Sequence, residues 1–308
     1  MRDPVSNRHW HSVCASIALL AGCVHSPIGC SSQESESPSR GPFPRQTVAG
    51  SEVRVLPRAA NGRAYQLHVG LPDSYENEPE RRYPVLYLCD GYWDFNLVKS
   101  LCDNLVQDMA IPEIIVVGLG YPGERPDYGR LRRWDLTPAP AKYQGADYDG
   151  PSGHAQEFLS VIENEIVPLV EHEYRGDPSY RVLAGSSLGG LFTLYAMFAR
   201  PGLFVAYIAA SPAAQWAEDW LLGFEEDFHR GGQPLGVRLF VTYAEKDPAM
   251  ILDGVKRFDG RLRERSYPGI TYQFRTVEGE GHAGTKGESY NRGVRFAFSP
   301  RAPEPSYP

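Results

Sequence analysis

Residues 181–199 read Arg181-Val-Leu-Ala-Gly-Ser-Ser-Leu-Gly-Gly-Leu-Phe-Thr-Leu-Tyr-Ala-Met-Phe-Ala199, and this stretch decides the fold. Residues 182–184 form an apolar run typical of a buried strand, and residues 191–199 carry apolar side chains at helical spacing. Between them, residues 185–189 follow the pattern Gly-x-Ser-x-Gly. The stretch therefore predicts a serine held on a sharp turn between a strand and a helix.

Ser187 is the better candidate nucleophile of the two serines in this turn. A serine on such a turn is crowded by the residues two positions away on either side, so only very small neighbours fit. For Ser187 these neighbours are Gly185 and Gly189, whereas for Ser186 they are an alanine and a leucine. The helix that begins at Leu188 would direct its unpaired N–H groups and its positive dipole end toward the serine oxygen. An ordinary Gly/Ser turn before a helix is the alternative.

Length, composition and charge narrow the class of protein. The chain has 308 residues, of which 42% are hydrophobic and 22% charged, as is ordinary for a globular protein. Residues 47–308 are enough to bury one large core as a single domain. The net charge of −7 argues against a nucleic-acid partner, which would need a basic face.

Residues 1–22 have the pattern of an export signal. Arg2 and Arg8 precede an apolar run over residues 13–21, which is as long as the hydrophobic region of a signal peptide and too short to span a bilayer. The run ends in Leu20-Ala21-Gly22-Cys23, which resembles the lipobox of bacterial lipoproteins. We expect Cys23 to carry lipid and to hold the exported domain at the cell envelope, in the periplasm or at the surface. Cleavage as an ordinary secretory peptide is the alternative.

The segment that follows is predicted to be a flexible tether. Residues 23–46 are rich in Ser, Pro and Gly and have no hydrophobic period. In the domain after it, only Cys89 and Cys102 remain as thiols. They could pair in an oxidising compartment, but Cys89 lies in an apolar run and is expected to pack as a small hydrophobic residue. No C-x-x-C spacing or His/Cys cluster indicates a metal site.

Apolar runs bounded by turn residues predict one sheet. Residues 65–71 alternate with a period of two, which predicts an antiparallel edge strand, whereas residues 83–89 and 113–118 are the near-continuous runs of strands buried on both faces. The amphipathic stretch 96–110 between the latter two completes a βαβ unit, and hence a parallel pair. Further strands are predicted at 204–210, 237–243 and 270–277, and further helices at 155–174, 213–232 and 288–298. The helix at 213–232 carries four aromatic residues at helical spacing, which indicates either a packed face or a cap over the pocket. The fold class is α/β, with a mostly parallel sheet, helices on both faces and antiparallel N-terminal edge strands.

The turn after the strand at 83–89 is the candidate source of an oxyanion donor. A serine nucleophile of this type uses the N–H of the following residue, here Leu188, together with an N–H from the loop after a neighbouring strand. Gly91 lets the backbone turn so that the N–H of Tyr92 can face Ser187. A plain type I turn before a helix is the alternative.

The general base follows from chain order. In this arrangement the acid and then the histidine follow the serine along the chain, and only His229 and His282 lie after Ser187. His229 falls within a predicted helix, whereas His282 lies on a glycine-flanked loop after the final strand, where the base belongs. The sequence therefore predicts that His282 activates Ser187.

The acid is expected just past the strand at 237–243, where Asp247 and Glu245 both lie. Ala244, three residues before Asp247, resembles the small residue of the Gly-x-x-Asp turn found in such hydrolases. Asp247 is therefore preferred, with the role of holding the imidazole tautomer, and Glu245 is the alternative.

From residue 83 to residue 282 the chain resembles the bacterial putative esterase family of the α/β-hydrolase superfamily, which is related to trilactone siderophore esterases, S-formylglutathione hydrolases and mycolyltransferases. The motifs that carry the resemblance are Leu88-Cys-Asp-Gly91, Asp135-Leu-Thr-Pro138, Gly153-His-Ala-x-x-Phe158, Gly185-Ser-Ser-Leu-Gly-Gly-Leu191, Ser211-Pro212 with Trp216, and Gly281-His282. The chain departs from the family pattern at His154, where a second glycine is usual, and in lacking the usual tryptophan pair after Ser-Pro. These departures concern the pocket, so the resemblance implies the α/β-hydrolase fold and ester hydrolysis without indicating the substrate.

Together these observations predict a lipid-tethered serine esterase that forms an acyl-enzyme on Ser187 and needs no cofactor. Its partner would be a small-molecule ester, with no nucleic acid, and with membrane contact only through the lipid on Cys23. Arg133 and Trp134, which follow a neighbouring strand, and Trp93 are the candidate substrate contacts. An acyltransferase with the same intermediate, or a binding protein that lacks the chemistry, are the alternatives. A siderophore, a sugar ester and an aryl ester are the alternative substrates.

Overall fold

The computed structural model describes residues 47–141 and 151–303. The predicted signal peptide, the predicted tether and Cys23 lie outside these ranges. Within them, no helix combines the length and the apolar character that crossing a bilayer requires.

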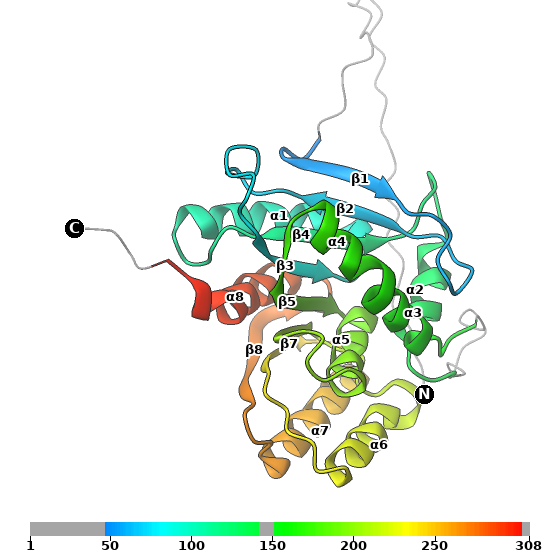
Figure 1. Ribbon diagram of the computed structural model, residues 1–308. Coiled ribbons are helices and arrows are strands. Elements are labelled where there is room, and N and C mark those ends of the chain that lie inside the picture. The colour runs from blue at the N-terminus through cyan, green and yellow to red at the C-terminus, as the bar shows by residue number, and fades with distance from the viewer. Residues whose placement is uncertain (1–46, 142–150, 304–308) are drawn as a thin grey trace, which may run out of the picture. The chain divides into compact units, whose positions relative to one another are not determined.

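One mixed sheet forms the centre of the described part of the chain (Figure 1). Its strands are β1 (Ser51–Val55), β2 (Gln66–Gly70), β3 (Tyr83–Leu88), β4 (Ile115–Gly120), β5 (Gly176–Ser186), β6 (Ala206–Ala210), β7 (Arg238–Lys246) and β8 (Thr271–Gly281). They lie in the order β1-β2-β4-β3-β5-β6-β7-β8. The pairs β1–β2 and β2–β4 are antiparallel, and the other pairs are parallel. The predicted α/β class, with antiparallel N-terminal strands on a mostly parallel sheet, is confirmed.

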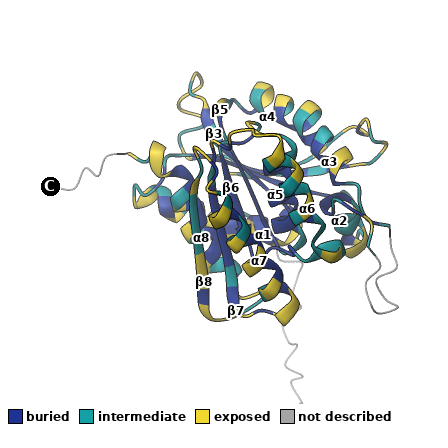
Figure 2. Cartoon of the chain, turned by 90° about the horizontal axis from the view of Figure 1, so that it is seen from below, coloured by how far each residue is buried: buried dark blue, intermediate teal, exposed yellow. Residues whose placement is uncertain are grey.

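Helices cover both faces of this sheet. They are α1 (Gly91–Gln107), α2 (Tyr128–Leu136), α3 (Ala155–Val161), the π-helical segment η2 (Ile162–Ile166), α4 (Val167–Glu173), α5 (Leu188–Ala199), α6 (Trp216–Arg230), α7 (Ala249–Arg265), α8 (Lys286–Phe298) and the short 3-10 turn η3 (Ser299–Arg301). α1 and α8 pack on one face, whereas α3 to α7 pack on the other. Figure 2 shows the buried central strands between helices whose outward faces are exposed, and the edge strand β8 largely exposed.

Alternate residues of the central strands point into opposite helix layers. On β3, Leu86 and Leu88 belong to the core shared with α1 and α8, whereas Val85 and Tyr87 belong to the core on the other face. All four side chains are fully buried. Because helices cover both faces, the strand needs apolar side chains in both directions, which explains the continuous apolar run.

Three N-terminal elements differ from the prediction. The edge strand predicted at residues 65–71 is β2, which lies inside the sheet because β1 pairs with its outer side. The hydrophobic pattern does not predict β1, since it alternates charged residues with the exposed Val53 and Val55. The helix predicted at 96–110 begins at Gly91, because Asp90 adopts a left-handed backbone conformation (φ 57°) that turns the chain directly from β3 into α1.

The middle of the chain contains an additional helix and a divided one. The arginine-rich sequence of α2 has no apolar period, but the Asp127 side chain caps the helix by accepting a hydrogen bond from the N–H of Arg130 at 3.0 Å. The helix predicted at 155–174 consists of α3, η2 and α4. Pro168, in the first turn of α4, has no N–H and crowds the carbonyl four residues earlier, which accounts for a π-helical segment ending just before it.

The C-terminal elements begin or end away from the predicted positions. Residues 278–281, predicted as loop, belong to β8, where a register shift pairs Lys246 with Gly281. The four aromatic residues of the α6 segment pack against the hydrophobic core, as the packed-face alternative predicts. Cys89 and Cys102 are free and buried, so the disulfide alternative is wrong and the prediction of a small packed hydrophobic residue is confirmed for Cys89.

Candidate active site

The candidate nucleophile lies at the carboxyl end of the central strand β5. Ser187 joins β5 to α5 with φ 58° and ψ −116°. Such a backbone conformation costs a non-glycine residue about 1–3 kcal/mol and persists mainly where function requires it. The turn is pinned, because the N–H of Ser187 donates to the Ala210 carbonyl at 2.9 Å and its own carbonyl accepts from the N–H of Ala213 at 3.0 Å.

The two glycines around Ser187 are required by space. A Cβ added to Gly185 would lie 2.4 Å from the backbone of Gly189, and one added to Gly189 would lie 2.9 Å from the Cβ of Cys89. The two serines also differ in access, since Ser186 is buried and its hydroxyl has no partner among the described residues, whereas Ser187 is partly exposed. The geometry thus favours Ser187 over Ser186, as the size argument from the sequence does.

The candidate base and acid are in contact. Nδ1 of His282 lies 2.5 Å from Oδ1 of Asp247, which is buried at the end of β7. The other carboxylate oxygen accepts hydrogen bonds at 2.7 Å from the hydroxyl of Ser211 and at 2.7 Å from the N–H of Ala244. Burial alone would raise the pKa of Asp247, but the hydrogen bonds from His282, Ser211 and the backbone N–H outweigh it, so the pKa lies below the usual aspartate value. The carboxyl group is therefore ionised at neutral pH.

The alternative acid points elsewhere. Oε2 of Glu245 accepts a hydrogen bond from the N–H of Gly279 at 2.7 Å, at an exposed position between β7 and β8. The structure brings Asp247, and not Glu245, to His282. Ser211 is an additional member of the site; its only sequence signal was the Ser-Pro motif, which gave no role for the hydroxyl.

Two backbone N–H groups are in position to serve as oxyanion donors. Leu188 is the first residue of α5 and Tyr92 the second residue of α1, so neither N–H has a partner within its helix. No carbonyl of the described residues outside the helices accepts from either of them. The strands that lead into these helices, β3 and β5, are hydrogen-bonded neighbours, so the two helix N-termini begin at the same end of the sheet.

The turn into α1 needs glycine for a steric reason. A Cβ added to Gly91 would lie 2.5 Å from the backbone of Gly118 in β4. Behind this turn, Arg132 of α2 binds both carboxylate oxygens of Asp90, at 2.7 and 2.6 Å. A Cβ on Gly189 would lie 3.1 Å from the carboxylate of Asp90, so this ion pair also borders α5. The Asp90–Arg132 ion pair therefore holds the loop that carries the N–H of Tyr92 against α5, the helix that carries the N–H of Leu188.

The comparison with known families agrees with this geometry. Residues 59–242 match the model of the family described as "Putative esterase". The chain belongs to this family. It is therefore a hydrolase of carboxylic esters with the α/β-hydrolase fold.

Several relatives of the esterase are named for siderophore esters. The esterase is 27% identical over 271 residues to ferri-bacillibactin esterase BesA of Bacillus subtilis, which covers 83% of this chain and 92% of the relative. It is 31% identical over 166 residues to the apo-salmochelin esterase of Escherichia coli, which covers 52% of this chain and 50% of the relative. Among solved structures, the BES protein of Bacillus cereus superposes with a TM-score of 0.74 at 26% identity, covering 84% of this chain and 99% of that chain.

A buried ionic cluster joins the two helices that flank the esterase site. Asp94 of α1 accepts hydrogen bonds from Nζ of Lys286 at 2.6 Å and from the hydroxyl of Tyr290 at 2.8 Å, both on α8. Burial raises the pKa of Asp94, and the bonds from Lys286 and Tyr290 oppose this shift only in part. The cluster links α1, whose first turn carries the candidate oxyanion donor, to α8, which follows the loop of His282. Sequence patterns do not indicate it, because its members lie far apart along the chain.

The three candidate substrate contacts occupy different environments. Trp93 is 48% exposed on α1. Trp134 is partly buried, stacks on the His154 ring with centroids 3.9 Å apart, and has the guanidinium of Arg63 at 5.2 Å from its ring centroid. Arg133 lies on α2, where its carbonyl accepts a hydrogen bond from the Thr137 hydroxyl at 2.7 Å. Substrate contact by these residues stays a prediction, and Trp93 is the one of the three that is exposed.

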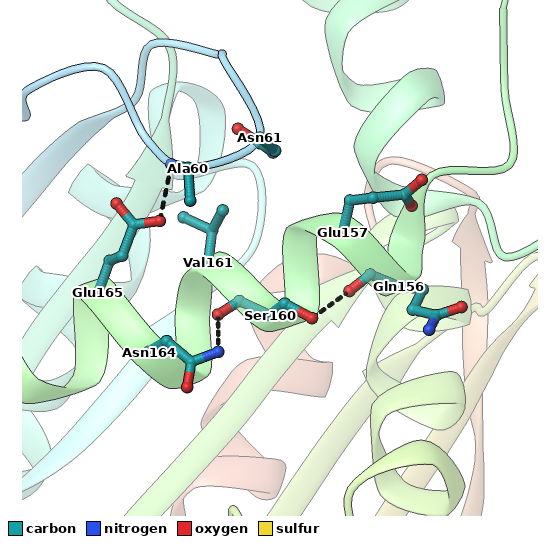
Figure 3. Close-up of a pocket in the computed structure, with 8 residues that line it drawn as sticks. All are labelled: Ala60, Asn61, Gln156, Glu157, Ser160, Val161, Asn164 and Glu165. Carbon is teal, nitrogen blue, oxygen red and sulfur yellow. Dashed lines mark hydrogen bonds between the residues drawn. The ribbon is translucent and has the colours of Figure 1, made fainter.

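A polar groove elsewhere contains none of the candidate catalytic residues. It lies between the loop after β1 and the helical stretch from α3 to η2 (Figure 3). Glu165 accepts a hydrogen bond from the N–H of Ala60 at 2.9 Å across it, and Asn164 donates to the Ser160 carbonyl at 2.8 Å. Glu165 thus bridges the two walls, whereas Ser160 and Asn164 bond within their own helical stretch, and the candidate site remains the turn at Ser187.

Proposed function

We propose that the esterase cleaves its substrate through an acyl-enzyme on Ser187, with His282 as general base and Asp247 as the acid that orients it. The observation that carries the proposal is the backbone of Ser187, whose positive φ of 58° presents the hydroxyl between a strand and the N-terminus of α5. The contact between His282 and Asp247 supports the same assignment. All three residues follow the carboxyl ends of parallel strands, the edge at which open α/β sheets bind ligands.

The chemistry then proceeds in two half-reactions. Nε2 of His282 takes the proton of the Ser187 hydroxyl, the oxygen attacks the ester carbonyl, and the N–H groups of Leu188 and Tyr92 stabilise the resulting oxyanion. Collapse expels the alcohol, which receives the proton from His282, and leaves the acyl group on Ser187. A water molecule, deprotonated by the same imidazole, attacks the acyl-enzyme and releases the acid. No cofactor enters either half-reaction.

The named relatives support a siderophore ester as the substrate class. BesA is described as a ferri-bacillibactin esterase, and the relative from Escherichia coli as an apo-salmochelin esterase. We expect this chain to hydrolyse ester bonds of such siderophores, with or without bound iron. Incubation with iron-free and iron-loaded trilactones, followed by mass spectrometry of the products, tests this expectation.

The location of the enzyme is part of the proposal. The sequence Leu20-Ala21-Gly22-Cys23 supports lipidation of Cys23 and attachment of the exported domain to the cell envelope. Metabolic labelling with a fatty-acid analogue should mark the full chain and not the Cys23→Ser variant. Equal labelling of the two would refute the lipid anchor without affecting the proposed chemistry.

Steady-state kinetics of two neighbouring serine variants test the catalytic assignment. Ser187→Ala should lower kcat on a 4-nitrophenyl ester by at least about a thousandfold, because the acyl-enzyme can no longer form. Ser186→Ala should retain turnover, since that hydroxyl is buried. Product analysis with added alcohols distinguishes hydrolysis from acyl transfer. Full activity of Ser187→Ala would refute the assignment.

A further inference from the structure

Three residues with an unfavourable backbone conformation lie at the carboxyl ends of neighbouring strands. They are Asp90 just after β3 (φ 57°), Ser187 after β5 (φ 58°) and Ser211 after β6 (φ 40°). These strands are consecutive in the sheet. A positive φ in a residue other than glycine is found mainly where function requires it. Because the first two turns carry the candidate oxyanion donor and the candidate nucleophile, a functional role is also expected for Ser211.

The backbone of Ser211 is tied to the strand on one side and to the nucleophile on the other. Its N–H donates to the carbonyl of Thr242 in β7 at 2.9 Å. Two residues later, the N–H of Ala213 donates to the carbonyl of Ser187 at 3.0 Å. The turn after β6 therefore connects the strand that leads to the candidate acid with the turn that presents the candidate nucleophile.

The hydroxyl of Ser211 has a defined direction. The residue is fully buried, and its Oγ lies 2.7 Å from Oδ2 of Asp247. The N–H of Ala244 points at both oxygens, at 2.7 Å from Oδ2 and 3.2 Å from Oγ. An ionised carboxylate can only accept, and the serine oxygen already faces a donor on its other side. The proton of the hydroxyl is therefore directed to Asp247.

This contact fixes the orientation of the carboxylate. Oδ1 of Asp247 faces Nδ1 of His282 at 2.5 Å, while Oδ2 is held by Ser211 and by a backbone N–H. A rotation of the carboxylate that moved Oδ1 away from the imidazole would also break the bonds to Oδ2. Burial would raise the pKa of Asp247, and the hydrogen bonds from His282 and Ser211 lower it below the usual value. The Ser211 hydroxyl thus serves both the direction and the charge of the carboxylate.

We propose that Ser211 is a positioning residue of the esterase, whose hydroxyl holds the Asp247 carboxylate so that Oδ1 stays on His282. The proposal rests on the proposed function, since Ser211 acts through Asp247. Because this contact lies behind the acid, its loss should lower kcat and leave KM unchanged. The N–H of Ala244 keeps its bond to Oδ2, so the expected loss is about tenfold in kcat, or about 1.4 kcal/mol.

The test is a double-mutant cycle measured with a fluorogenic 4-methylumbelliferyl ester. Ser211→Ala and Ser211→Gly both remove the hydroxyl, and glycine also relieves the positive φ. Each should lower kcat about tenfold with KM within about twofold. In the Asp247→Asn background no ionised carboxylate remains to be held, so adding Ser211→Ala should change kcat by less than about twofold. A merely structural role would give the same fractional loss in both backgrounds.

Tyr180→Phe is the matched control, because it also removes a buried hydroxyl, which donates to the Ala297 carbonyl at 2.8 Å between β5 and α8. Its kcat should stay within about twofold of the unmodified enzyme, and urea midpoints check that every variant is folded. A kcat of Ser211→Ala or Ser211→Gly within twofold of the unmodified enzyme would overturn the proposal, as would equal fractional losses in the two backgrounds. Failure of the proposed function is distinguishable, because Asp247→Asn alone would then remain active.

Discussion

Replacement of Asp247 by asparagine separates the two candidate acids. The carboxylate has two separate tasks: Oδ1 faces Nδ1 of His282 at 2.5 Å, and Oδ2 accepts from the Ser211 hydroxyl and the Ala244 N–H. If the asparagine keeps its oxygen toward Ala244, its NH2 group faces His282 and holds Nδ1 as an acceptor. The proton then resides on Nε2, and the imidazole cannot accept the proton of Ser187.

The opposite orientation of the asparagine is also unfavourable. Its NH2 group would then face the buried N–H of Ala244, which leaves a donor without an acceptor and costs about 1–3 kcal/mol. The first orientation is therefore the favoured one, and the expected loss is about 10⁴-fold in kcat, or about 5 kcal/mol of transition-state stabilisation. The matched control is Glu245→Gln, because Gln keeps an oxygen that can accept from the Gly279 N–H at this exposed position. Its kcat should stay within about twofold of the unmodified enzyme.

The assay is hydrolysis of a 4-nitrophenyl ester by both variants from pH 6 to pH 9, with thermal unfolding as a check that each is folded. A folded Asp247→Asn enzyme within tenfold of the unmodified kcat would refute the role of Asp247. A loss of similar size in Glu245→Gln, with Asp247→Asn still active, would assign the role of the acid to Glu245 instead.

Three further substitutions and one control, Gly223→Ala, test the energetics of the fold around the site. Burial raises the pKa of Asp135 from its ordinary value of 3.8 to about 6, so this group stabilises the fold below about pH 4 and that contribution is lost as pH rises through 6. The free energy of unfolding of the unmodified enzyme minus that of Asp135→Asn should therefore fall by about 3 kcal/mol from pH 4 to pH 7, as measured by urea titration. A difference that does not change with pH would contradict this. Asp94→Asn should lower the free energy of unfolding by about 1–3 kcal/mol, because it removes the charge partner of the half-buried Lys286 and weakens the hydrogen bond of the buried Tyr290 hydroxyl; an unchanged urea midpoint would count against the cluster. Gly185→Ala should destabilise the fold by about 1–3 kcal/mol, because the added methyl would lie 2.4 Å from the backbone of Gly189. Gly223→Ala, with no atom within 4 Å of the added methyl, should be neutral or stabilising by up to about 1 kcal/mol. Equal urea midpoints for the two variants would contradict the crowding around Ser187.

The parts of the fold that could be predicted from the sequence are those set by local pattern. Strands β3 and β5 are covered on both faces, so their apolar runs are continuous and easy to identify. The turn at Ser187 was predictable because the crowding there acts on residues only two positions away. His282 was predictable because chain order in this arrangement leaves few candidates.

The features that escaped prediction depend on contacts between distant segments or lack a hydrophobic period. β1 is held by backbone pairing with β2, and its outward valines carry no signal of burial. α2 starts at a side-chain cap and is rich in arginine, so no apolar stripe marks it. The hydroxyl of Ser211 reaches Asp247 only because β6 and β7 are neighbours, and the pairing of Asp94 with α8 arises only once the two helices pack on one face.

The most direct test of the central claim is covalent labelling of the intact enzyme with a fluorophosphonate, followed by peptide mass spectrometry. The account predicts a single adduct on Ser187, lost in Ser187→Ala, retained in Ser186→Ala and strongly slowed in Asp247→Asn. An adduct on another serine, or no adduct on a folded enzyme that still hydrolyses esters, would contradict it.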